Sequence, residues 1–357
     1  MKNRVYVLYG GKSCEHDVSL ASACNIINEL DKNKYDVFSL YINNNGTWSK
    51  PFQIIKSITL TELKQLDTSK YSQIQSIFDF FVGVLNTNSI IFPVIHGTYG
   101  EDGKVQGMLE MFNIPYVGNG VSASSIAMDK TLSKKIFSSQ DIPQAKYVSF
   151  SKKQFHSFKN SCVQLIEEEI GFPCFVKPSN MGSSIGINRC MTVEELFLAI
   201  EEAFNYDYMV LIEEEIIGRE VLIAITGNEE IQCSLAGEWQ RKISFFNYED
   251  KYMDAELTPI IPAVLPKKTY LKMCSYAKNA YKTLGCSGML RADFFITENH
   301  EIYLNEVNTI PGFTQHSMFP LLFQRSENKT YTELLDYLIQ LGFSQHKQKN
   351  SLQYIRG

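Results

Sequence analysis

The start of the chain alternates strand-like and helix-like patterns, and this alternation restricts the possible folds more than any other feature. Residues 5–9 form a short apolar run that ends at Gly10, and residues 19–30 form an amphipathic run. A second apolar run covers residues 35–42. A strand, a helix and a strand in this order predict a βαβ unit with parallel strands. The loop at residues 11–19 follows the first strand, where α/β folds place their ligands.

The same patterns predict further elements along the chain. Thr192 and Glu195 form a capping-box signature that predicts the start of a helix reaching about Phe204. Residues 44–88 show little periodicity and are expected to be a surface segment, and residues 343–357 are polar and expected to be loose. The other expected strands are 90–95, 114–117, 174–177, 187–190, 208–215, 221–225 and 231–235, and the other expected helices are 105–112, one through 128–137, 162–170, 269–284 and 331–341.

Two neighbouring apolar runs near residue 300 each carry a pair of polar side chains. Arg291 and Asp293 lie two residues apart in the first run, and Glu306 and Asn308 lie two apart in the second. Residues two apart in an extended strand share a face. A hairpin centred on residues 299–300 would place Asp293 opposite Glu306 and Arg291 opposite Asn308. Two acids, an amide and a guanidinium are therefore predicted to meet at one patch.

Two opposed carboxylates need a compensating charge, and the sequence leaves two sources open. Like charges across a strand ladder repel, and their burial is costly without a cation. One source is a bound metal, because oxygen ligation by Asp, Glu and Asn suits Mg²⁺ or Mn²⁺, and Mg²⁺ usually shares its shell with phosphates. The other source is Arg291, which would neutralise the acids in a purely structural network. Taken alone, the hairpin supports the two interpretations equally.

Composition restricts the class of protein. At 357 residues the chain is long enough for two or three domains. Its net charge of −5 and its pI near 5.8 argue against a nucleic-acid or anionic-membrane surface. No run approaches the roughly 18 apolar residues of a membrane span, and we expect no signal peptide. The eight cysteines include no C-x-x-C pair, which is typical of reduced packing residues in a cytoplasmic protein.

Two strand ends carry candidate nucleotide contacts, although no standard phosphate loop is present. Residues 97–104 are similar to a P-loop, but the spacing has one residue too many and Val105 replaces the required Ser or Thr. Lys177 ends a strand directly before a Gly/Ser loop that can hold phosphate, the alternative being a lysine that reaches out to solvent. Glu213 ends another strand and could accept an adenine amino group, although a solvated acidic run is the commoner meaning. Combined with an oxygen-ligand metal site, these features indicate nucleoside-triphosphate chemistry.

A series of ordered segments then carries a resemblance. The segments are YGGKSCEHDVS (9–19), HGTYGEDG (96–103), MDK (128–130), VKPSNMGSSIGI (176–187), EDKY (249–252), LRADFF (290–295) and NEVNTIPGFTQHSMFP (305–320). Together they resemble the D-alanine:D-alanine ligases of the ATP-grasp superfamily, over residues 1 to about 342. The resemblance implies a mixed α/β (α+β) ATP-grasp fold. Three domains are implied: 1–128 with the parallel sheet and the first D-alanine site, and then 129–216 and 217–357, which clamp ATP, the last holding the metal site.

The resemblance also implies an activity and its setting. The implied reaction is the ATP-dependent ligation of two D-alanines through an acyl phosphate, which supplies D-alanyl-D-alanine for peptidoglycan, cell-wall biogenesis and cell shape. The implied partners are small molecules in the cytoplasm, with neither nucleic acid nor membrane, and the implied assembly is a homodimer. ATP is a substrate, and two Mg²⁺ or Mn²⁺ ions are the implied cofactors.

Site residues follow from the matching motifs. The metal ligands implied are Asp293, Glu306 and Asn308. For ATP, the implied phosphate and base contacts are Lys130, Lys177, Ser184, Lys251 and Glu213, with Glu220 on the ribose. For the chemistry and the two D-alanines, the implied residues are Glu15, His96, Ser183, Tyr252, Arg291, Gly312, Ser317 and Met318.

Within that set, distinct roles are implied. Glu15 would bind the first D-alanine ammonium, and Arg291 with the Gly312 N–H would stabilise the tetrahedral oxyanion. Ser317 and Met318 would hold the second substrate. The side chains of Glu15, Ser183 and Tyr252 would form a hydrogen-bonded triad that closes a lid.

Related ligases that add D-lactate or D-serine share most of these motifs and remain the alternatives. The lactate-adding group usually has histidine in place of the Lys251-Tyr252 pair, and the serine-adding group tends to have arginine where Met318 stands. An apolar Met318 suits a methyl group better than a hydroxymethyl group. A non-catalytic nucleotide-binding protein of the same fold is a further alternative, which the loss of a phosphate lysine or metal carboxylate would favour. None is lost here.

Overall fold

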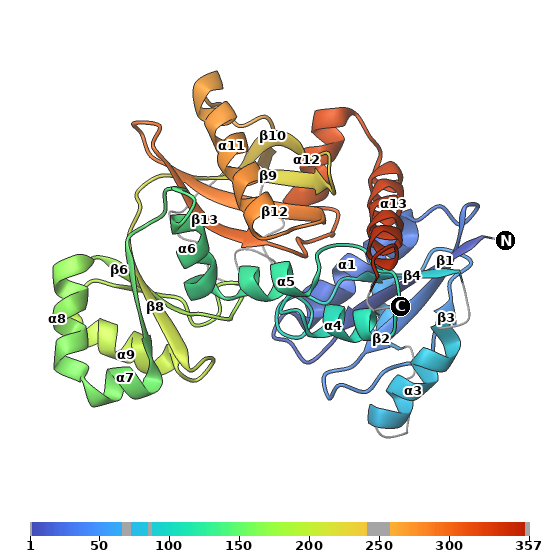
Figure 1. Cartoon of the computed structure of the whole chain (residues 1–357), viewed down its shortest axis with the longest axis horizontal. Helices are drawn as coiled ribbons and strands as arrows, with labels where there is room; N and C mark the ends of the chain where they lie inside the picture. Colours follow the sequence, from blue (N-terminus) through green and yellow to red (C-terminus); the bar gives the residue numbers. More distant parts are fainter. Residues whose placement is uncertain (1, 66–72, 85–87, 241–257, 354–357) are drawn as a thin grey trace.

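Three β-sheets organise the part of the chain that the computed structural model describes, residues 2–65, 73–84, 88–240 and 258–353. Figure 1 shows each sheet with its own helices: the first at one side of the molecule, the second at the other, and the third between and above them. Both ends of the chain lie beside the first sheet.

The first sheet confirms the predicted βαβ unit. Strands β1 and β2 pair in parallel with Val5 opposite Val37, and β4 pairs in parallel on the other side of β1. The strand expected at 114–117 is wrong, since only Tyr116 forms an isolated bridge to Ile91. Pro115 has no N–H to donate, which limits the ladder there. The elements are β1 (Asn3–Gly10), α1 (His16–Glu29), β2 (Tyr35–Ile42), β4 (Ser89–Pro93), α4 (Lys104–Met111) and α5 (Val121–Met128).

The segment 44–88 is more structured than expected. A two-residue strand, β3 (Phe52–Gln53), adds an antiparallel edge to β2. Helices α2 (Leu60–Lys64) and α3 (Gln73–Val84) follow. A strand and a helix as short as β3 and α2 leave no periodicity in the sequence, whereas α3 has 12 residues with a periodic apolar pattern that the sequence reasoning missed.

The second sheet is antiparallel, in the order β5-β8-β6-β7. The continuous helix predicted through 128–137 is wrong, because α5 ends at Met128 and Asp129 caps a new helix, α6, by accepting the Leu132 N–H at 3.0 Å. Thr192 caps α9 as predicted, accepting the Glu195 N–H at 3.3 Å. The elements are α6 (Lys130–Ser138), β5 (Tyr147–Ser151), α7 (Lys152–Ser157), α8 (Lys159–Glu169), β6 (Cys174–Pro178), β7 (Asn188–Cys190), α9 (Val193–Ala203) and β8 (Met209–Glu214).

The third sheet has the order β11-β10-β9-β12-β13 and contains the polar hairpin. Asp293 lies opposite Glu306, and Arg291 lies opposite Asn308, as predicted. The turn itself differs from the prediction. Ile296 pairs with Ile302, so the hairpin is centred on residue 299 and not between residues 299 and 300. A bulge at residue 305 restores the predicted register. The elements are β9 (Arg219–Gly227), β10 (Gln232–Trp239), β11 (Pro259–Ile260), α11 (Lys267–Thr283), β12 (Gly288–Ile296), β13 (Ile302–Asn308) and α12 (Met318–Glu327).

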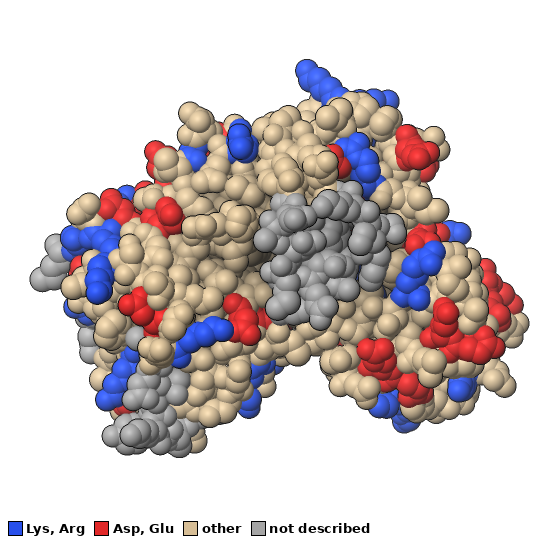
Figure 2. Space-filling view, turned by 180° about the vertical axis from the view of Figure 1, so that it is seen from behind, with Lys and Arg blue, Asp and Glu red and all other residues tan. Residues whose placement is uncertain are grey.

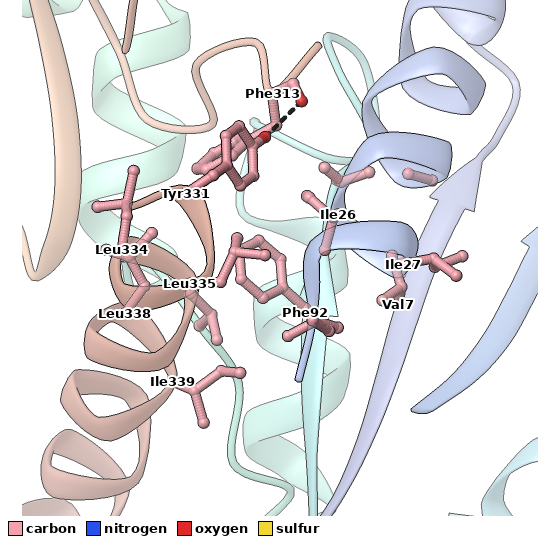
Figure 3. Close-up of a cluster of buried hydrophobic side chains, with 14 of the residues drawn as sticks. Val7, Ile26, Ile27, Phe92, Phe313, Tyr331, Leu334, Leu335, Leu338 and Ile339 are labelled. Atoms are coloured by element: carbon pink, nitrogen blue, oxygen red, sulfur yellow. Dashed lines mark hydrogen bonds between the residues drawn. The ribbon is translucent and has the colours of Figure 1, made fainter. Parts of the chain in front are cut away.

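The last helix, α13 (Tyr331–Asn350), is longer than predicted, and the expectation of a loose tail from residue 343 is wrong for the described residues. In Figure 3, Leu335 and Ile339 of α13 lie against Phe92 of the first sheet. The polar end of the helix is also held, since Lys349 Nζ donates to Glu110 Oε1 at 2.5 Å. The sequence alone did not reveal this contact, because Glu110 lies on α4, far from Lys349 along the chain.

Surface properties agree with the composition. On the face shown in Figure 2, the basic and acidic side chains of the described residues are intermingled. Within the same described residues, no helix is both long enough and apolar enough to cross a membrane.

The packing of α13 on the first sheet can be tested at two helical glycines. A Cβ added at Gly342 would lie 2.7 Å from the Tyr116 carbonyl oxygen and 2.8 Å from Ile90 Cδ1. A Cβ added at Gly107 in α4 would meet only Val121 Cγ2, at 3.9 Å. We expect Gly107→Ala to stabilise the protein by up to about 1 kcal/mol, because alanine favours a helix. We expect Gly342→Ala to destabilise it by roughly 1–3 kcal/mol, because the added methyl group overpacks the contact.

Urea unfolding of both variants measures the difference. The two substitutions are chemically identical and both lie inside helices, so each serves as a control for the other. Equal stabilisation by both would contradict the packing of α13 on Tyr116.

Candidate active site

A cavity of about 610 Å³ lies where elements of all three sheets meet. Its walls come from the start of α1, the loop after β4, helix α6, the loop after β6, and the strands β9, β12 and β13. The predicted site residues that line it are Glu15, His96, Lys130, Ser183, Glu220, Arg291, Asp293, Glu306, Asn308, Gly312, Ser317 and Met318. Segments as far apart in the chain as Glu15 and Met318 thus converge on one space.

The remaining predicted residues lie elsewhere. Lys177 and Glu213 sit next to the cavity wall, in contact with each other. Ser184 follows Ser183 in the loop after β6 and does not line the cavity. Lys251 and Tyr252 lie outside the described residues.

The hairpin places its polar groups in direct contact. Arg291 donates from Nε and Nη2 to the two oxygens of Asp293, both at 2.7 Å. Asn308 Nδ2 donates to Asp293 Oδ2 at 3.2 Å. Lys130 Nζ approaches Glu306 Oε2 at 3.8 Å from α6. Asp293 is buried, whereas Arg291 and Glu306 are partly exposed toward the cavity.

Electrostatics help to choose between the two interpretations of the hairpin. Burial raises the pKa of Asp293 above its usual value, and Glu306 and Glu220 raise it further, although Arg291 acts in the opposite direction. The guanidinium therefore does not fully offset the burial and the neighbouring acids. A divalent cation at these oxygens would supply the missing positive charge.

The donor atoms fit a hard cation. Among the described residues, no group of three or more His, Cys, Asp or Glu side chains forms a metal cluster. The candidate set has two carboxylates, from Asp293 and Glu306, and the amide oxygen of Asn308, which suits an ion that keeps other oxygen ligands. A carboxylate has about four acceptor positions, so the bidentate contact with Arg291 leaves Asp293 able to bind further groups.

A buried cluster of two lysines and one acid lies beside the cavity. Lys177 Nζ lies 2.6 Å from Glu213 Oε2, and Lys134 Nζ lies 2.8 Å from Glu213 Oε1. Burial alone would raise the pKa of Glu213, but the two lysines outweigh it and lower the pKa to about 2. Lys177 also approaches Asn305 Oδ1 at 3.5 Å, so the bulge in β13 directs that side chain toward the cluster.

Lys134 was missed in the sequence. The available signal was its position one helical turn after Lys130 within α6, which places the two lysines on the same face.

Glu15 lies at the N-terminus of α1, between the loop after β4 and the loop after β6. The Ser183 hydroxyl donates a short hydrogen bond to Glu15 Oε1, which brings together two members of the predicted triad. A Cβ added at Gly97 or Gly182 would lie 2.3 or 2.8 Å from Glu15 Oε2. Glycine at both positions therefore lets the loops approach the carboxylate.

His96 is buried and has both ring nitrogens occupied. Its Nδ1 lies 3.0 Å from the Ile310 carbonyl oxygen, which can only accept, so this nitrogen carries the hydrogen. Its Nε2 then accepts from the Ser22 hydroxyl at 3.0 Å. Burial lowers the pKa of His96 to about 4, with Arg291 acting in the same direction and the Ile310 carbonyl opposing. At neutral pH, His96 is an uncharged group that joins the loop after β4 to helix α1 and to the segment after β13.

Glu101 is a site residue that the sequence reasoning did not single out. It accepts the Gly97 N–H at 3.0 Å through one oxygen and the Ile310 N–H at 3.1 Å through the other. Burial and the charge of Glu15 raise the pKa of Glu101 to about 8, against the effect of these amides. The motif HGTYGEDG contained this residue, but only the glycines and the histidine suggested a role.

The segment before α12 completes the wall. Ser317 Oγ accepts the Thr314 N–H at 2.9 Å. A Cβ added at Gly312 would lie 2.7 Å from Ser317 Oγ, so the backbone passes directly beside the hydroxyl. Met318 is buried at the start of α12.

The two amide contacts of Glu101 predict a measurable stability effect. In Glu101→Gln, only one side-chain oxygen remains, so one buried amide N–H would face an NH₂ group. An unsatisfied buried donor costs about 1–3 kcal/mol. Because the raised pKa of Glu101 makes this acid costly at neutral pH, the loss should be measured by urea unfolding at about pH 4, where Glu101 is largely protonated in both the folded and the unfolded protein. Glu301→Gln, an exposed acid in the hairpin turn, should show almost no change. Equal stability of the Glu101 variant and the parent would contradict this role.

Residues 4–119 match the family described as D-ala D-ala ligase N-terminus, and residues 136–340 match the family described as D-ala D-ala ligase C-terminus. The chain is 45% identical over 363 residues to a D-alanine–D-alanine ligase of Geobacillus thermodenitrificans, with 99% of each chain covered. It is 42% identical over 360 residues to that of Bacillus licheniformis, again with 99% of each covered.

Solved structures give the same result for the fold. The D-alanine-D-alanine ligase from Coxiella burnetii superposes with a TM-score of 0.80 at 31% identity, covering 98% of this chain and 96% of the other. The VanG D-Ala:D-Ser ligase from Enterococcus faecalis superposes with a TM-score of 0.77 at 31% identity, covering 96% and 99%. The predicted ATP-grasp fold is confirmed by these neighbours.

Proposed function

Because the chain belongs to the D-alanine–D-alanine ligase family, we propose that it joins two D-alanines to D-alanyl-D-alanine, using ATP, for peptidoglycan synthesis. The observation that carries the proposal is the convergence of an acid–amide hairpin, buried lysines and the Glu15–Ser183 contact on one cavity. A triphosphate and a carboxylate must approach each other in this reaction, so positive groups are required at their meeting point.

In this proposal, ATP lies between the second and third sheets. Lys130, Lys177 and Lys251 contact the phosphates, and Ser184 adds a contact from its loop. Glu213 accepts the adenine amino group, and Glu220 binds the ribose. The support is the position of Lys130 and Glu220 in the cavity wall and the ionised state of Glu213.

Asp293, Glu306 and Asn308 would hold Mg²⁺ or Mn²⁺, and we propose two ions as in the family. When bound, such ions neutralise the phosphate charge and polarise the γ-phosphate. The support is the oxygen donor set and the raised pKa of Asp293. Arg291 is held by its bidentate contact with Asp293 and lines the cavity, which supports a role facing the reacting substrate.

The first D-alanine would place its ammonium on Glu15, near His96, with its carboxylate toward the γ-phosphate. Attack by that carboxylate on the γ-phosphate gives an acyl phosphate and releases ADP, and the deprotonated amine of the second D-alanine then displaces phosphate. Arg291 and the Gly312 N–H would meet the oxyanion of the tetrahedral intermediate. Because His96 is uncharged, it does not repel the substrate ammonium at this position.

The second D-alanine would lie against Ser317 and Met318. Met318 is buried and apolar, which favours a methyl group over the hydroxymethyl group of D-serine. The lid would close through Glu15, Ser183 and Tyr252 and keep water from the acyl phosphate. The structural similarity to a D-Ala:D-Ser ligase keeps D-serine as the second candidate substrate.

A direct assay tests this function. Phosphate release and dipeptide formation are measured with ATP, Mg²⁺ and D-alanine, and then with D-lactate or D-serine as the second substrate. We expect D-alanyl-D-alanine as the main product. Glu306→Gln should reduce turnover by at least about 100-fold without unfolding, because a metal carboxylate is lost. Formation of the mixed products alone would contradict the substrate assignment, and an active Glu306 variant would contradict the metal assignment.

We also propose three domains, 1–128, 129–216 and 217–357, and a cytoplasmic location. Each proposed boundary falls between two of the sheets. A cytoplasmic location provides ATP and is consistent with eight free thiols.

A homodimer is the proposed assembly, and helix α3 offers a surface for it. Ile74, Phe78 and Val82 repeat every four residues on α3 and are 82%, 60% and 59% exposed. Such an apolar stripe on a soluble protein commonly marks an interface.

The stripe predicts a change of mass in solution. Phe78→Glu should convert the dimer to a monomer in light scattering, because a charge would be buried at the interface. Leu198→Glu is the control, since Leu198 is 75% exposed on α9, far along the chain from α3. A dimer that survives the Phe78 variant would contradict the use of α3.

A further inference from the structure

Lys134 is almost fully buried, although no proposed catalytic step uses it. Its side chain is 3% exposed, and it lines the cavity from α6. Its ammonium lies 2.8 Å from Glu213 Oε1 and 5.4 Å from the centre of the Tyr147 ring. Burial lowers the pKa of this lysine, whereas Glu213 raises it and Lys177 lowers it. Burying an ammonium is costly, so its presence requires a reason.

Neutralising Glu213 is not a sufficient reason. Lys177 already lies 2.6 Å from the other oxygen of Glu213, so one acid and one base would balance without Lys134. The second lysine gives the three side chains an excess of positive charge. An apolar residue of similar volume would pack at this position at lower cost. The effect specific to Lys134 is on the state of the Glu213 carboxylate.

That effect is to keep Glu213 ionised and fixed in orientation. Each carboxylate oxygen is engaged by a different lysine, one from α6 and one from β6. A carboxylate has about four acceptor positions, so two contacts with lysines leave positions for a further donor. Glu213 is thereby held as a group that accepts hydrogen bonds and does not donate them.

We propose that Lys134 is a positioning residue that makes the site select a purine nucleotide with an amino group at position 6 of the base. This inference rests on the proposed function, in which Glu213 faces the adenine amino group. A 6-amino group donates to the fixed carboxylate. A 6-oxo group, as in inosine or guanosine nucleotides, presents an acceptor to an acceptor and is repelled. Without Lys134, Glu213 is more easily protonated and reoriented, and a protonated carboxyl group can donate to a 6-oxo group.

The experiment compares ATP with inosine triphosphate, which carries oxygen in place of the 6-amino group. For Lys134→Met, we expect the ratio of kcat/KM for ATP to that for inosine triphosphate to fall about tenfold, a change typical of one charged hydrogen bond. Because Lys134 acts on the group that faces the base, most of the change should appear in KM for the nucleotide and less of it in kcat. An unchanged ratio would overturn the proposal.

The chain supplies a matched control one residue further along. Lys135 is exposed on the same helix, so Lys135→Met removes the same charge from α6 without touching Glu213. It should leave the ratio unchanged. Lys134→Arg, which keeps the charge, should retain more of the ratio than Lys134→Met, and the comparison remains valid for any variant with a cooperative melting transition. An equal loss in the Lys135 variant would show a general charge effect and overturn the proposal.

A double-mutant cycle separates positioning from a general structural role. In Glu213→Gln, the side-chain amide can both donate and accept, so selection at position 6 should already be weak. Adding Lys134→Met to this variant should change the ratio by less than about twofold, since Lys134 acts through Glu213. A further tenfold loss in the double variant would show that Lys134 acts independently and would overturn the inference.

Binding measurements distinguish this inference from the proposed function. Calorimetric titration with ADP and with inosine diphosphate, both with Mg²⁺, needs no turnover and no D-alanine. Selective binding of ADP that is lost in Lys134→Met supports the inference even if the amino-acid substrates are wrong. Equal affinity of the parent protein for the two diphosphates would overturn it even if dipeptide is formed.

Discussion

The opposition of Asp293 and Glu306 across the β12–β13 ladder is the constraint on which the site depends. Two acids in this register repel, and one of them is fully buried. Arg291 supplies a cation from the same strand, yet the pKa of Asp293 remains raised. Further positive charge has to come from outside the hairpin. Lys130 approaches Glu306 from α6, so the balance of charge couples the third sheet to the helix that precedes the second.

A similar balance holds the loops of the first sheet in place. Glu101 bonds to the Gly97 amide in its own loop and to the Ile310 amide after β13. His96 also bonds to the Ile310 carbonyl, so Ile310, in the segment after β13, receives contacts from both Glu101 and His96. Glu15 reaches the Ser183 hydroxyl in the second unit. Acids that follow strands of the first sheet thus connect that sheet to segments of the second and third sheets. This explains why its loops line the cavity.

The sequence was sufficient for local patterns and for pairs of polar residues in adjacent strands. The register of Asp293 and Glu306 followed from side-chain alternation, although the predicted turn was displaced and only the bulge at residue 305 restored it. Lys134 and Glu101 were not found, because their roles depend on partners remote in the chain. Helix α13 was predicted too short for the same reason, since the residue that holds Lys349 is on α4. Long-range polar contacts leave no periodic signal in a sequence.

The charges around the cavity explain why the nucleotide would bind there together with divalent metal ions. Among the described residues, six acidic side chains and three basic ones, counting Lys and Arg, line the space. The acidic excess would oppose a free triphosphate, even with Lys177 nearby. Divalent cations reverse this relation, because the acids that repel phosphate are the ones that bind the ions. Burial strengthens both effects by lowering the local dielectric. An acidic cavity can therefore receive a polyanion when the polyanion arrives with its metal, and the same acids then hold the complex in place.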